Sequence, residues 1–332
     1  MPLGEKKLIE RIRRSARGGK SLVTGIGDDC AVLRVPRGHE LLVTTDFTIE
    51  NVHFLRDWHA PELVGRRCLT RGLSDIAAMG GEPRAAFLSL AVAGEVPQKW
   101  VDRFLKGLLA LAGEFDVPLA GGDTAQSASG IQADIVVVGS VPKGKAVLRS
   151  GAKPGDQIYV TGRLGGAAAV LARLIESKPV GANLRRFRPE PRVAVARWLR
   201  QREKASAMID LSDGLSTDLE HICTESRVGA EIEAAAIPRA RLASGAEPVA
   251  LELALHGGED YELLFTSATA VPSRVAGVPI TRIGRITRSR GMRLIGADGK
   301  PRALKAEGWE HFQRNSRKVR TLDGLYYLLK TR

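Results

Sequence analysis

The sequence predicts a two-domain protein of mixed structure, in the α+β or α/β class. The chain has 332 residues and 44% of them are hydrophobic, whereas single cores rarely grow past ~250 residues. Strand-like and helix-like segments alternate in both halves. Between the halves, residues 142–156 are rich in glycine, proline and basic residues without a hydrophobic period. Such a segment is typical of a domain connection.

The first half is predicted to contain three helices and four strands. Pro61 is a good first helical residue, and Gly80-Gly81 ends the helix that it starts. After Pro97 the apolar residues keep a 3.6-residue spacing, which indicates another helix. The expected helices cover residues 8–17 and 61–79 and the segment after Pro97, and the expected strands cover 40–45, 85–93, 117–120 and 131–141.

The second half continues the alternation. Strands are expected over 157–161, 207–211, 261–266 and 279–287, and helices over 165–176, 192–202 and 216–226. We therefore expect an N-terminal domain over 1–148, a C-terminal domain over 149–312 and a basic tail over 313–332.

The net charge of +13 is unevenly distributed. Residues 1–20, 185–204 and 313–332 carry +16 between them, which leaves −3 for the rest of the chain. A protein that binds RNA or DNA would need basic residues interleaved with stacking aromatics. Aromatic residues make up only 5% of this chain, so we expect no specific nucleic-acid partner, and this class remains the rival interpretation.

The sequence lacks the marks of membrane insertion and secretion. Its longest clear uncharged apolar run, from Ala85 to Gly94, is far short of the ~18 residues that span a bilayer. No signal-like segment opens the chain, so we expect a cytoplasmic protein without a membrane partner. Cys30, Cys68 and Cys223 fit neither a disulfide framework nor a zinc site, and are expected to be small, buried or half-buried hydrophobes.

Six acidic segments lie beside glycine, serine or threonine at the ends of strand-like runs. Any one of them, taken alone, is most simply a turn or a helix cap. If several converge, their repulsion calls for cations, and hard oxygen ligands without a His or Cys cluster suit Mg²⁺, which usually acts together with phosphates. The segments are Gly27–Asp29, Thr44–Asp46, Leu73–Asp75, Gly121–Thr124, Asp210–Gly214 and Gly257–Asp260.

Common nucleotide-binding and nucleophile motifs are missing. The stretch from Gly139 to Lys145 matches G-x-x-x-x-G-K, but Ala146 stands where a Ser or Thr would hold Mg²⁺. No G-x-G-x-x-G, H-E-x-x-H or G-x-S-x-G occurs. A lone residue such as His53 or Trp309 is, by itself, more simply a hydrogen-bonded or core residue.

Read together, the motifs resemble those of the thiamine-monophosphate kinase family. The resemblance runs in order from about residue 25 to Phe312, although the GDD and GGD pieces are shared with the wider aminoimidazole-ribonucleotide synthetase superfamily. The matching segments are Gly25–Val32, Thr44–Asp46, Asn51–Phe54, Leu73–Gly80, Gly121–Thr124, Arg149–Asp156, Ile209–Gly214 and Gly257–Leu263.

The resemblance implies a fold and an activity. Strands of the N-terminal domain would pair with a second subunit into a dimeric barrel, and the C-terminal α/β domain would pack over it. The enzyme would be an ATP-dependent phosphotransferase that converts thiamine monophosphate into thiamine diphosphate by direct in-line transfer, with several Mg²⁺ ions. Thiamine monophosphate, ATP and a second copy of the chain are therefore the expected partners.

The resemblance also assigns roles to matching positions. It implies Mg²⁺ ligands at Asp29, Thr44, Thr45, Asp46, Asp75, Asp123, Asp210 and Asp213. It implies nucleotide contacts at Gly122, Asp123, Arg149 and Ser212, and substrate contacts at His53, Glu259 and Trp309. Asp46, Asp75, Asp213 and Arg149 would be the catalytic set.

Elementary chemistry agrees with these roles. The attacking phosphate oxygen is largely ionised at neutral pH because the second phosphate pKa lies near ~6, so no general base is needed. The difficulty is the meeting of two polyanions, which cations and Arg149 would ease. Thiazolium is cationic, and the carboxylate of Glu259 and the aromatic face of Trp309 are suitable groups to hold it.

The sequence departs from the family pattern at one position, and one alternative function is kept open. Gly72 stands where relatives often carry Asn, which leaves that contact in question. Another ATP-dependent enzyme of the superfamily, such as selenophosphate synthetase or aminoimidazole ribonucleotide synthetase, is the alternative function. The former expects a reactive cysteine in a glycine-rich N-terminal loop, and residues 14–27 contain none.

Overall fold

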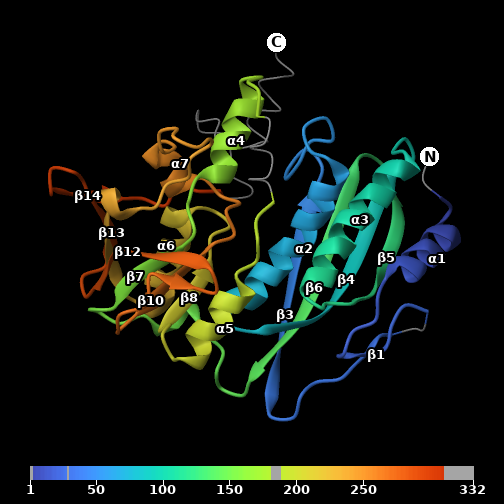
Figure 1. The fold of residues 1–332 in the computed structure, drawn as a ribbon, viewed down its shortest axis with the longest axis horizontal. Helices are drawn as coiled ribbons and strands as arrows, with labels where there is room; N and C mark the ends of the chain where they lie inside the picture. The colour runs from blue at the N-terminus through green and yellow to red at the C-terminus, as the bar shows by residue number, and fades with distance from the viewer. Residues whose placement is uncertain (1–2, 28–29, 181–187, 310–332) are drawn as a thin grey trace. The chain divides into compact units, whose positions relative to one another are not determined.

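The computed structural model describes residues 3–27, 30–180 and 188–309 (Figure 1). The chain divides into two compact units. Of the described residues, unit 1 takes in those from Leu3 to Ile76 and from Glu82 to Gly144, and unit 2 takes in Ala77–Gly81 and those from Lys145 to Trp309. Each unit has its own sheet and its own cluster of buried apolar side chains. Among the described helices, none is long and apolar enough to cross a membrane.

Unit 1 is built on a four-stranded sheet with helices on one face (Figure 1). The strand order is β3 (His39–Ile49), β6 (Ile131–Pro142), β4 (Glu82–Ala93) and β5 (Leu119–Ser127). Only the β4–β5 pair in this sheet is parallel. The helices of unit 1 are α1 (Glu5–Ser15), α2 (Pro61–Ala78, which crosses into unit 2 after Ile76) and α3 (Gln98–Glu114), and a small ribbon pairs β1 (Leu22–Thr24) with β2 (Val32–Leu33).

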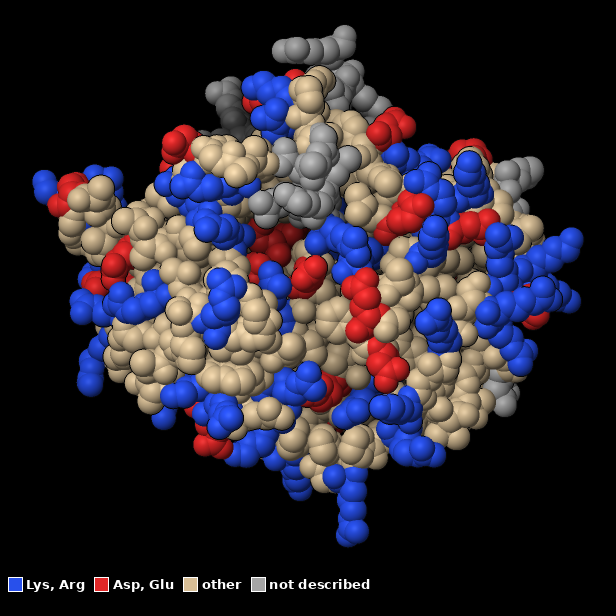
Figure 2. Space-filling view, in the orientation of Figure 1, with Lys and Arg blue, Asp and Glu red and all other residues tan. Residues whose placement is uncertain are grey.

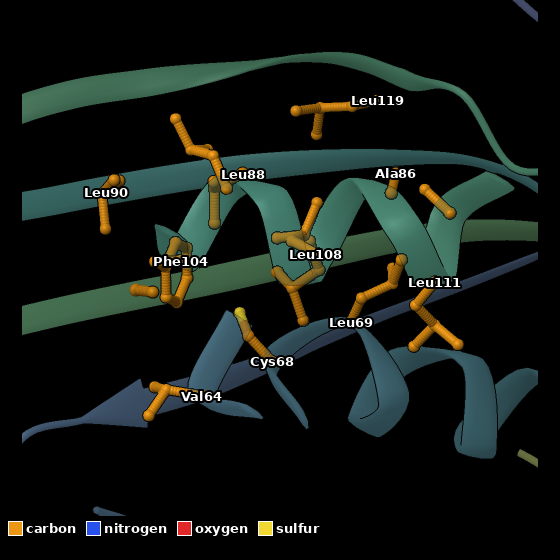
Figure 3. Close-up of a cluster of buried hydrophobic side chains, with 14 of the residues drawn as sticks. Val64, Cys68, Leu69, Ala86, Leu88, Leu90, Phe104, Leu108, Leu111 and Leu119 are labelled. Carbon is orange, nitrogen blue, oxygen red and sulfur yellow. The ribbon is translucent and has the colours of Figure 1, made fainter. Parts of the chain in front are cut away.

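The core of unit 1 lies between the sheet and the pair α2 and α3. Figure 3 shows Cys68 and Leu69 of α2, Phe104 and Leu108 of α3 and Leu88 of β4 in one cluster between the helices and the sheet. Phe104 and Leu108 are fully buried, and each such side chain contributes about 1.5–3 kcal/mol relative to exposure. The 3.6-residue apolar spacing that predicted α3 is thus the face that packs on the sheet.

Two glycines let α2 and α3 approach closely. A Cβ at Gly65 would lie 1.9 Å from the carbonyl oxygen of Phe104, and a Cβ at Gly107 would lie 1.9 Å from that of Glu62. Neither position has room for a side chain. The contact between these helices is therefore made by backbone against backbone, which a hydrophobic pattern alone does not reveal.

The opposite face of the unit 1 sheet carries apolar side chains in the open. Leu41, Val43 and Phe47 of β3 are 52%, 67% and 57% exposed. They alternate along the strand, so they share one face. A row of large apolar side chains is uncommon on a free protein surface and marks an interaction site.

Unit 2 is built on a larger and mostly antiparallel sheet. The strand order is β14 (Pro301–Leu304), β13 (Gly291–Ile295), β9 (Gly229–Glu233), β12 (Val278–Thr287), β7 (Gln157–Thr161), β10 (Leu263–Ser267) and β8 (Ala207–Asp210), with β11 (Arg274–Val275) paired to β12. Its helices are α4 (Gly166–Ile175), α5 (Val193–Gln201), α6 (Leu215–Ser226) and α7 (Leu251–His256), with short 3₁₀ turns η1 (Arg149–Gly151) and η3 (Ala234–Ala236). Helix α6 buries Leu215, Leu219 and Ile222 in the core of this unit.

Two strands of unit 1 differ from the sequence prediction. Strand β3 does not end at Asp46, because it pairs with β6 over eleven residues, from His39 opposite Pro142 to Ile49 opposite Gln132. Strand β5 begins at Leu119 and includes the GGDT segment, which the sequence placed after a strand. The register of β4 against β5 shifts between the pairs Ala86–Leu119 and Phe87–Gly121, and glycines commonly mark such irregularities.

The cysteine prediction is correct at two of the three positions. Cys68 and Cys223 are buried, and burial raises the pKa of each thiol to about 12. Cys30 is exposed instead of buried. It follows the acidic Asp28-Asp29 pair in the sequence, and no hydrophobic period there favours its burial.

Candidate active site

In unit 1, the helix-covered face of β3 brings two of the expected residues, Thr44 and Asp46, toward α2, which carries a third, Asp75. The Thr44 hydroxyl donates a hydrogen bond to Oδ2 of Asp75. Oδ1 of Asp46 lies 3.3 Å from Nη1 of Arg71, whose side chain is only 8% exposed. Thr44 and Asp46 are two residues apart on a strand and so face the same side. The structure thus groups Thr44, Asp46 and Asp75 along α2, next to a buried guanidinium that the sequence did not single out.

The open face of the same sheet holds the other two expected ligands of this unit. The Thr45 hydroxyl donates to Oδ1 of Asp134 at 2.6 Å. Asp123 and Asp134 line a small pocket together with Phe47 and Ser89. The predicted ligands of unit 1 are therefore divided between two faces of one sheet. Asp29 lies outside the described residues.

Asp134 is a carboxylate that sequence reasoning missed. Ser89 of β4 is in register with Asp134 of β6 on one side and with Asp123 of β5 on the other. The signal in the sequence is weak: a single acidic residue interrupts the apolar run from Ile131 to Val141. Only the strand register shows that it belongs beside Thr45 and Asp123.

Gly122 allows close approach to the backbone. It has φ of 145°, and a Cβ there would lie 1.8 Å from the carbonyl oxygen of Leu88. Only glycine fits this conformation without strain. The position suits a backbone contact with a nucleotide, as the sequence predicted, but it is also fully explained by the pairing of β5 with β4.

Gly72 has a packing reason in this chain. A Cβ at Gly72 would lie 2.4 Å from Cγ2 of Val137 on β6. Helix α2 and strand β6 therefore meet closely at this point, and the Asn that relatives often carry would need a smaller neighbour or a shifted helix. In this chain, Gly72 therefore leaves the space that the Val137 side chain occupies.

His53 has a well-defined local role. Its Nδ1 accepts a hydrogen bond from the backbone N–H of Ile49 at 2.9 Å, so the ring proton is on Nε2 in the neutral form. The residue lines a small pocket with Thr48, Arg67 and Arg71. His53 is thus both hydrogen-bonded and close to the arginine that contacts Asp46.

In unit 2, the turn between β8 and α6 carries the expected acidic residues. Asp210 is the last residue of β8 and is buried, and Ser212-Asp213-Gly214 leads into α6. Oδ2 of Asp218 accepts hydrogen bonds from the backbone N–H groups of Asp213 at 3.2 Å and Gly214 at 3.1 Å. Through these two hydrogen bonds, a side chain in the first part of α6 holds the turn that precedes the helix.

The same turn contains a concentrated acidic cluster. Burial raises the pKa of Asp218 well above its usual value, and the charges of Asp213 and Asp210 raise it further. Oxygen atoms of Asp213 and Asp218 and a ring nitrogen of His221 lie within 4.8 Å of one another. Asp218 and His221 were missed from the sequence, where the one available signal was an acidic residue in the first turn of a predicted helix.

The two expected substrate contacts of unit 2 are attached to this turn. The backbone N–H of Glu259 donates to the carbonyl oxygen of Ser212 at 2.8 Å, and that of Trp309 donates to the carbonyl oxygen of Asp213 at 3.1 Å. Gly258 lies so close that a Cβ would be 2.3 Å from the Ser212 carbonyl oxygen. The structure therefore brings Ser212, Asp213, Glu259 and Trp309 together, although they are far apart in sequence.

The segment around Glu259 is firmly held. Asp260 accepts hydrogen bonds from the backbone N–H groups of Gly165 at 2.6 Å and Ala167 at 3.4 Å, at the start of α4. Desolvation raises the pKa of this carboxyl group to about 7 despite these bonds. Glu262 is paired with Arg192 through contacts of 2.5 and 2.7 Å.

The backbone of Arg149 is anchored at the C-terminal end of α6, away from the acidic turn. Its carbonyl oxygen accepts a hydrogen bond from Ser226, the last residue of α6, at 2.7 Å. The turn with Ser212 and Asp213 precedes the first residue of α6. A helix of this length spans roughly 18 Å, so the Arg149 backbone is anchored at the end of α6 that is opposite this turn.

The donor set fits Mg²⁺. Both units present carboxylate and hydroxyl oxygens, which are the hard ligands that this ion prefers. In unit 2 the crowding of Asp210, Asp213 and Asp218 is the arrangement that a cation relieves. None of the cysteines lies in the described cluster, so softer metals are less suited.

The fold and the site define an AIR synthase related protein. The family model of the AIR synthase related protein N-terminal domain matches residues 27–141, and that of the C-terminal domain matches residues 153–296. The chain is 40% identical to the thiamine-monophosphate kinases of Salmonella typhimurium and Escherichia coli, over 94% of this chain and 99% of each relative. The chain belongs to the thiamine-monophosphate kinase family.

Solved structures agree with this placement. The thiamine-monophosphate kinase from Stenotrophomonas maltophilia is 35% identical with a TM-score of 0.78, over 91% of this chain and 99% of that chain. The structure of AaThiL complexed with AMPPCP and TMP is 33% identical with a TM-score of 0.73, over 94% and 99%. The HypE protein of E. coli is 19% identical with a TM-score of 0.75, over 93% and 98%, and shares the fold alone.

These comparisons confirm three expectations from the sequence. The family resemblance is correct, the two-domain mixed fold is correct, and the chain is a phosphotransferase of this family. The individual ligand and substrate residues are not tested by the comparisons and are carried forward as proposals.

Proposed function

We propose that this chain transfers the γ-phosphoryl group of ATP to the phosphate of thiamine monophosphate, giving thiamine diphosphate and ADP. The observation that carries the proposal is the attachment of Glu259 and Trp309 to the Ser212–Asp213 turn. A carboxylate and an aromatic ring suited to a cationic heterocycle are thereby fixed beside aspartates suited to a phosphate-bound cation. Membership in the kinase family supports the same reaction.

The chemistry needs little from the protein beyond placement and charge. The bond between the γ-phosphorus and the β–γ bridging oxygen breaks, and a bond forms between that phosphorus and an oxygen of the acceptor phosphate. Because this oxygen is already ionised, no residue has to remove a proton. The described site accordingly rests on carboxylates, hydroxyls and cationic side chains rather than on a histidine base.

Mg²⁺ is part of the proposal. Several Mg²⁺ ions are expected, and Asp29, Thr44, Thr45, Asp46, Asp75, Asp123, Asp210 and Asp213 would hold them, with Asp134 as an added candidate. The ions would neutralise phosphate charge and stabilise the charge that develops during transfer. Arg149 would assist at the phosphates, and Gly122 and Ser212 would contact the nucleotide.

Substrate recognition would come from His53, Glu259 and Trp309. Trp309 is half-buried, which leaves part of its surface for a ligand. A cation over an aromatic face contributes about 0.5–2 kcal/mol, depending on how far it is desolvated. Glu259 would add charge attraction to the same group.

We further propose that the chain acts as a homodimer in the cytoplasm, where ATP is present. Strand β3 is at the edge of its sheet, and Leu41, Val43 and Phe47 are exposed on its open face. Both features suit pairing with a second copy.

A polyanion such as RNA is a weaker candidate for a partner. On the face that Figure 2 shows, Lys and Arg are scattered, with Asp and Glu among them.

The function is tested by incubating the purified chain with ATP, Mg²⁺ and thiamine monophosphate and separating the thiamine compounds by chromatography. Thiamine is the control acceptor, because it has the same rings but no phosphate. We expect thiamine diphosphate from the monophosphate and no product from thiamine. Phosphorylation of thiamine, or ATP turnover without any diphosphate, would refute the proposal.

A further inference from the structure

The backbone at Glu259 and Tyr261 is in an unusual conformation. Glu259 has φ of 72° and Tyr261 has φ of 51°, although neither is glycine. Non-glycine residues rarely adopt this left-handed region, and such residues persist only where the surrounding structure holds them. Two of them, separated by one residue, indicate that this segment is shaped for a purpose beyond connecting α7 to β10.

Contacts on every residue hold the segment in place. The N–H of Tyr261 donates to the carbonyl oxygen of Leu211 at 2.9 Å, in addition to the bond from Glu259 to Ser212. Asp260 is held at the start of α4, and Glu262 also accepts a hydrogen bond from the Thr161 hydroxyl at 2.6 Å. The backbone that carries Glu259 is thus fixed from both sides.

The side chain of Glu259 has its own contact within the segment. The hydroxyl of Tyr261 donates a hydrogen bond to Oε1 of Glu259 at 3.2 Å. Tyr261 is only 2% exposed, so its ring is packed and its hydroxyl has a defined position. The paired left-handed conformations place the side chains of residues 259 and 261 where they can meet.

We propose that Tyr261 is a positioning residue that orients the Glu259 carboxylate toward the cationic ring of the substrate. This inference rests on the proposed function and assigns a specificity role to a residue outside the predicted site. A free glutamate side chain samples many rotamers, and ordering it on binding lowers affinity. A buried hydroxyl that holds the carboxylate beforehand removes that cost.

The role predicts a particular kinetic signature. The cationic ring is remote from the transferred phosphoryl group, so its contacts are the same in the ground state and the transition state. Loss of such uniform binding raises KM and leaves kcat unchanged. A merely structural role for Tyr261 would instead lower stability and affect ATP and thiamine monophosphate alike.

The test compares Tyr261→Phe, Glu259→Gln and the double variant in the full chain. Tyr261→Phe keeps the ring and removes only the hydroxyl. We expect it to raise the KM for thiamine monophosphate about fivefold, the size typical of the net contribution of one hydrogen bond, with kcat and the KM for ATP unchanged. In the Glu259→Gln background, the same substitution should have less than a twofold effect.

Tyr159→Phe is the matched control. Tyr159 is also buried in unit 2, where its ring stacks on Phe265 at a centroid distance of 5.3 Å. It should leave the KM for thiamine monophosphate unchanged. Calorimetric titration with thiamine monophosphate in the presence of AMPPCP and Mg²⁺ gives the same comparison without turnover.

The outcomes separate the inference from the proposed function. An unchanged KM and Kd in Tyr261→Phe, or a full fivefold effect that persists in the Glu259→Gln background, would overturn the positioning role. If Glu259→Gln itself binds thiamine monophosphate normally, the substrate role of Glu259 fails and the inference fails with it. Absence of thiamine diphosphate with normal binding would refute only the proposed reaction.

Discussion

The backbone N–H of Trp309 donates a hydrogen bond to the carbonyl oxygen of Asp213 at 3.1 Å. This bond joins the last part of the described chain to the turn that starts α6. It is reinforced by Gly308, whose N–H donates to the Thr217 hydroxyl at 3.0 Å. The proposed cation-binding aspartate and the proposed ring-binding tryptophan are therefore held at one place by a backbone–backbone hydrogen bond and by a neighbouring bond to the Thr217 side chain.

Trp309→Ala is expected to raise the KM for thiamine monophosphate about tenfold, because a cation–π contact and its packing are lost. Trp309→Phe should raise it less, since a smaller aromatic face remains. Steady-state kinetics with each substrate varied in turn measures both. An equal rise in the KM for ATP would show that the tryptophan acts on the fold of the turn rather than on the thiamine ring.

Asp46→Asn and Asp213→Asn are each expected to lower kcat by at least about a hundredfold, since each removes charge that holds a phosphate-bound cation. Asp298→Asn is the control, because this residue makes an exposed ion pair with Arg302. Circular dichroism checks that the fold is kept. Near-normal turnover in both active-site variants at varied Mg²⁺ would contradict the carboxylate assignment.

Gly107→Ala is expected to destabilise the protein by about 3 kcal/mol or more, because the new Cβ would meet the Glu62 carbonyl group. Gly113→Ala on the same helix is the matched control, since nothing lies within 4 Å of its Cβ position. There, replacing glycine in a helix should be neutral or stabilising by up to about 1 kcal/mol. Urea unfolding of both variants measures the difference, and equal effects would show that α2 and α3 are not in backbone contact.

Val43→Asp tests the proposed dimer. Val43 is 67% exposed, so a charge there costs an isolated chain little, whereas burial at an interface would be costly. We expect light scattering to show a dimer for the wild type and a monomer for the variant. A wild type that is monomeric at all concentrations would contradict the proposal.

His59 is expected to make stability depend on pH. Burial, followed by the charge of Arg67, lowers the pKa of His59 from 6.5 to about 4. Between these values the unfolded chain binds a proton that the folded chain does not, so stability falls by up to roughly 1.4 kcal/mol per unit as pH drops from 6.5 to 4. Asp260, with its raised pKa of about 7, acts in the opposite direction over an overlapping range.

The comparison of wild type with His59→Asn isolates this contribution. Chemical unfolding at several pH values should show that the variant loses less stability than the wild type over the same acid range. Parallel stability curves would mean that His59 is not buried in its neutral form.

Much of this molecule could be predicted from its sequence, because the informative residues lie in local segments. The acidic motifs and the family resemblance can be recognised from such segments. Most helices are predicted to within a few residues of their observed bounds. The extent of β3 and β5 is not, because an aspartate or a glycine pair normally suggests the end of a strand. Their continuation depends on pairing with β6 and β4.

The missed residues share a physical cause. Asp134 becomes a candidate site residue only through its register with Ser89, and Arg71 only through its contact with Asp46. Tyr261 has an apolar ring that is typical of a core residue, and its proposed role depends on the left-handed conformation of Glu259. These are tertiary relationships between residues that are individually unremarkable in the sequence.

The most direct test of the central claim is ³¹P NMR of a reaction containing the purified chain, ATP, Mg²⁺ and thiamine monophosphate. The account predicts that the monophosphate signal is replaced by the two coupled signals of thiamine diphosphate, with one ADP formed for each. Formation of ADP and inorganic phosphate while the thiamine monophosphate signal stays unchanged would contradict it.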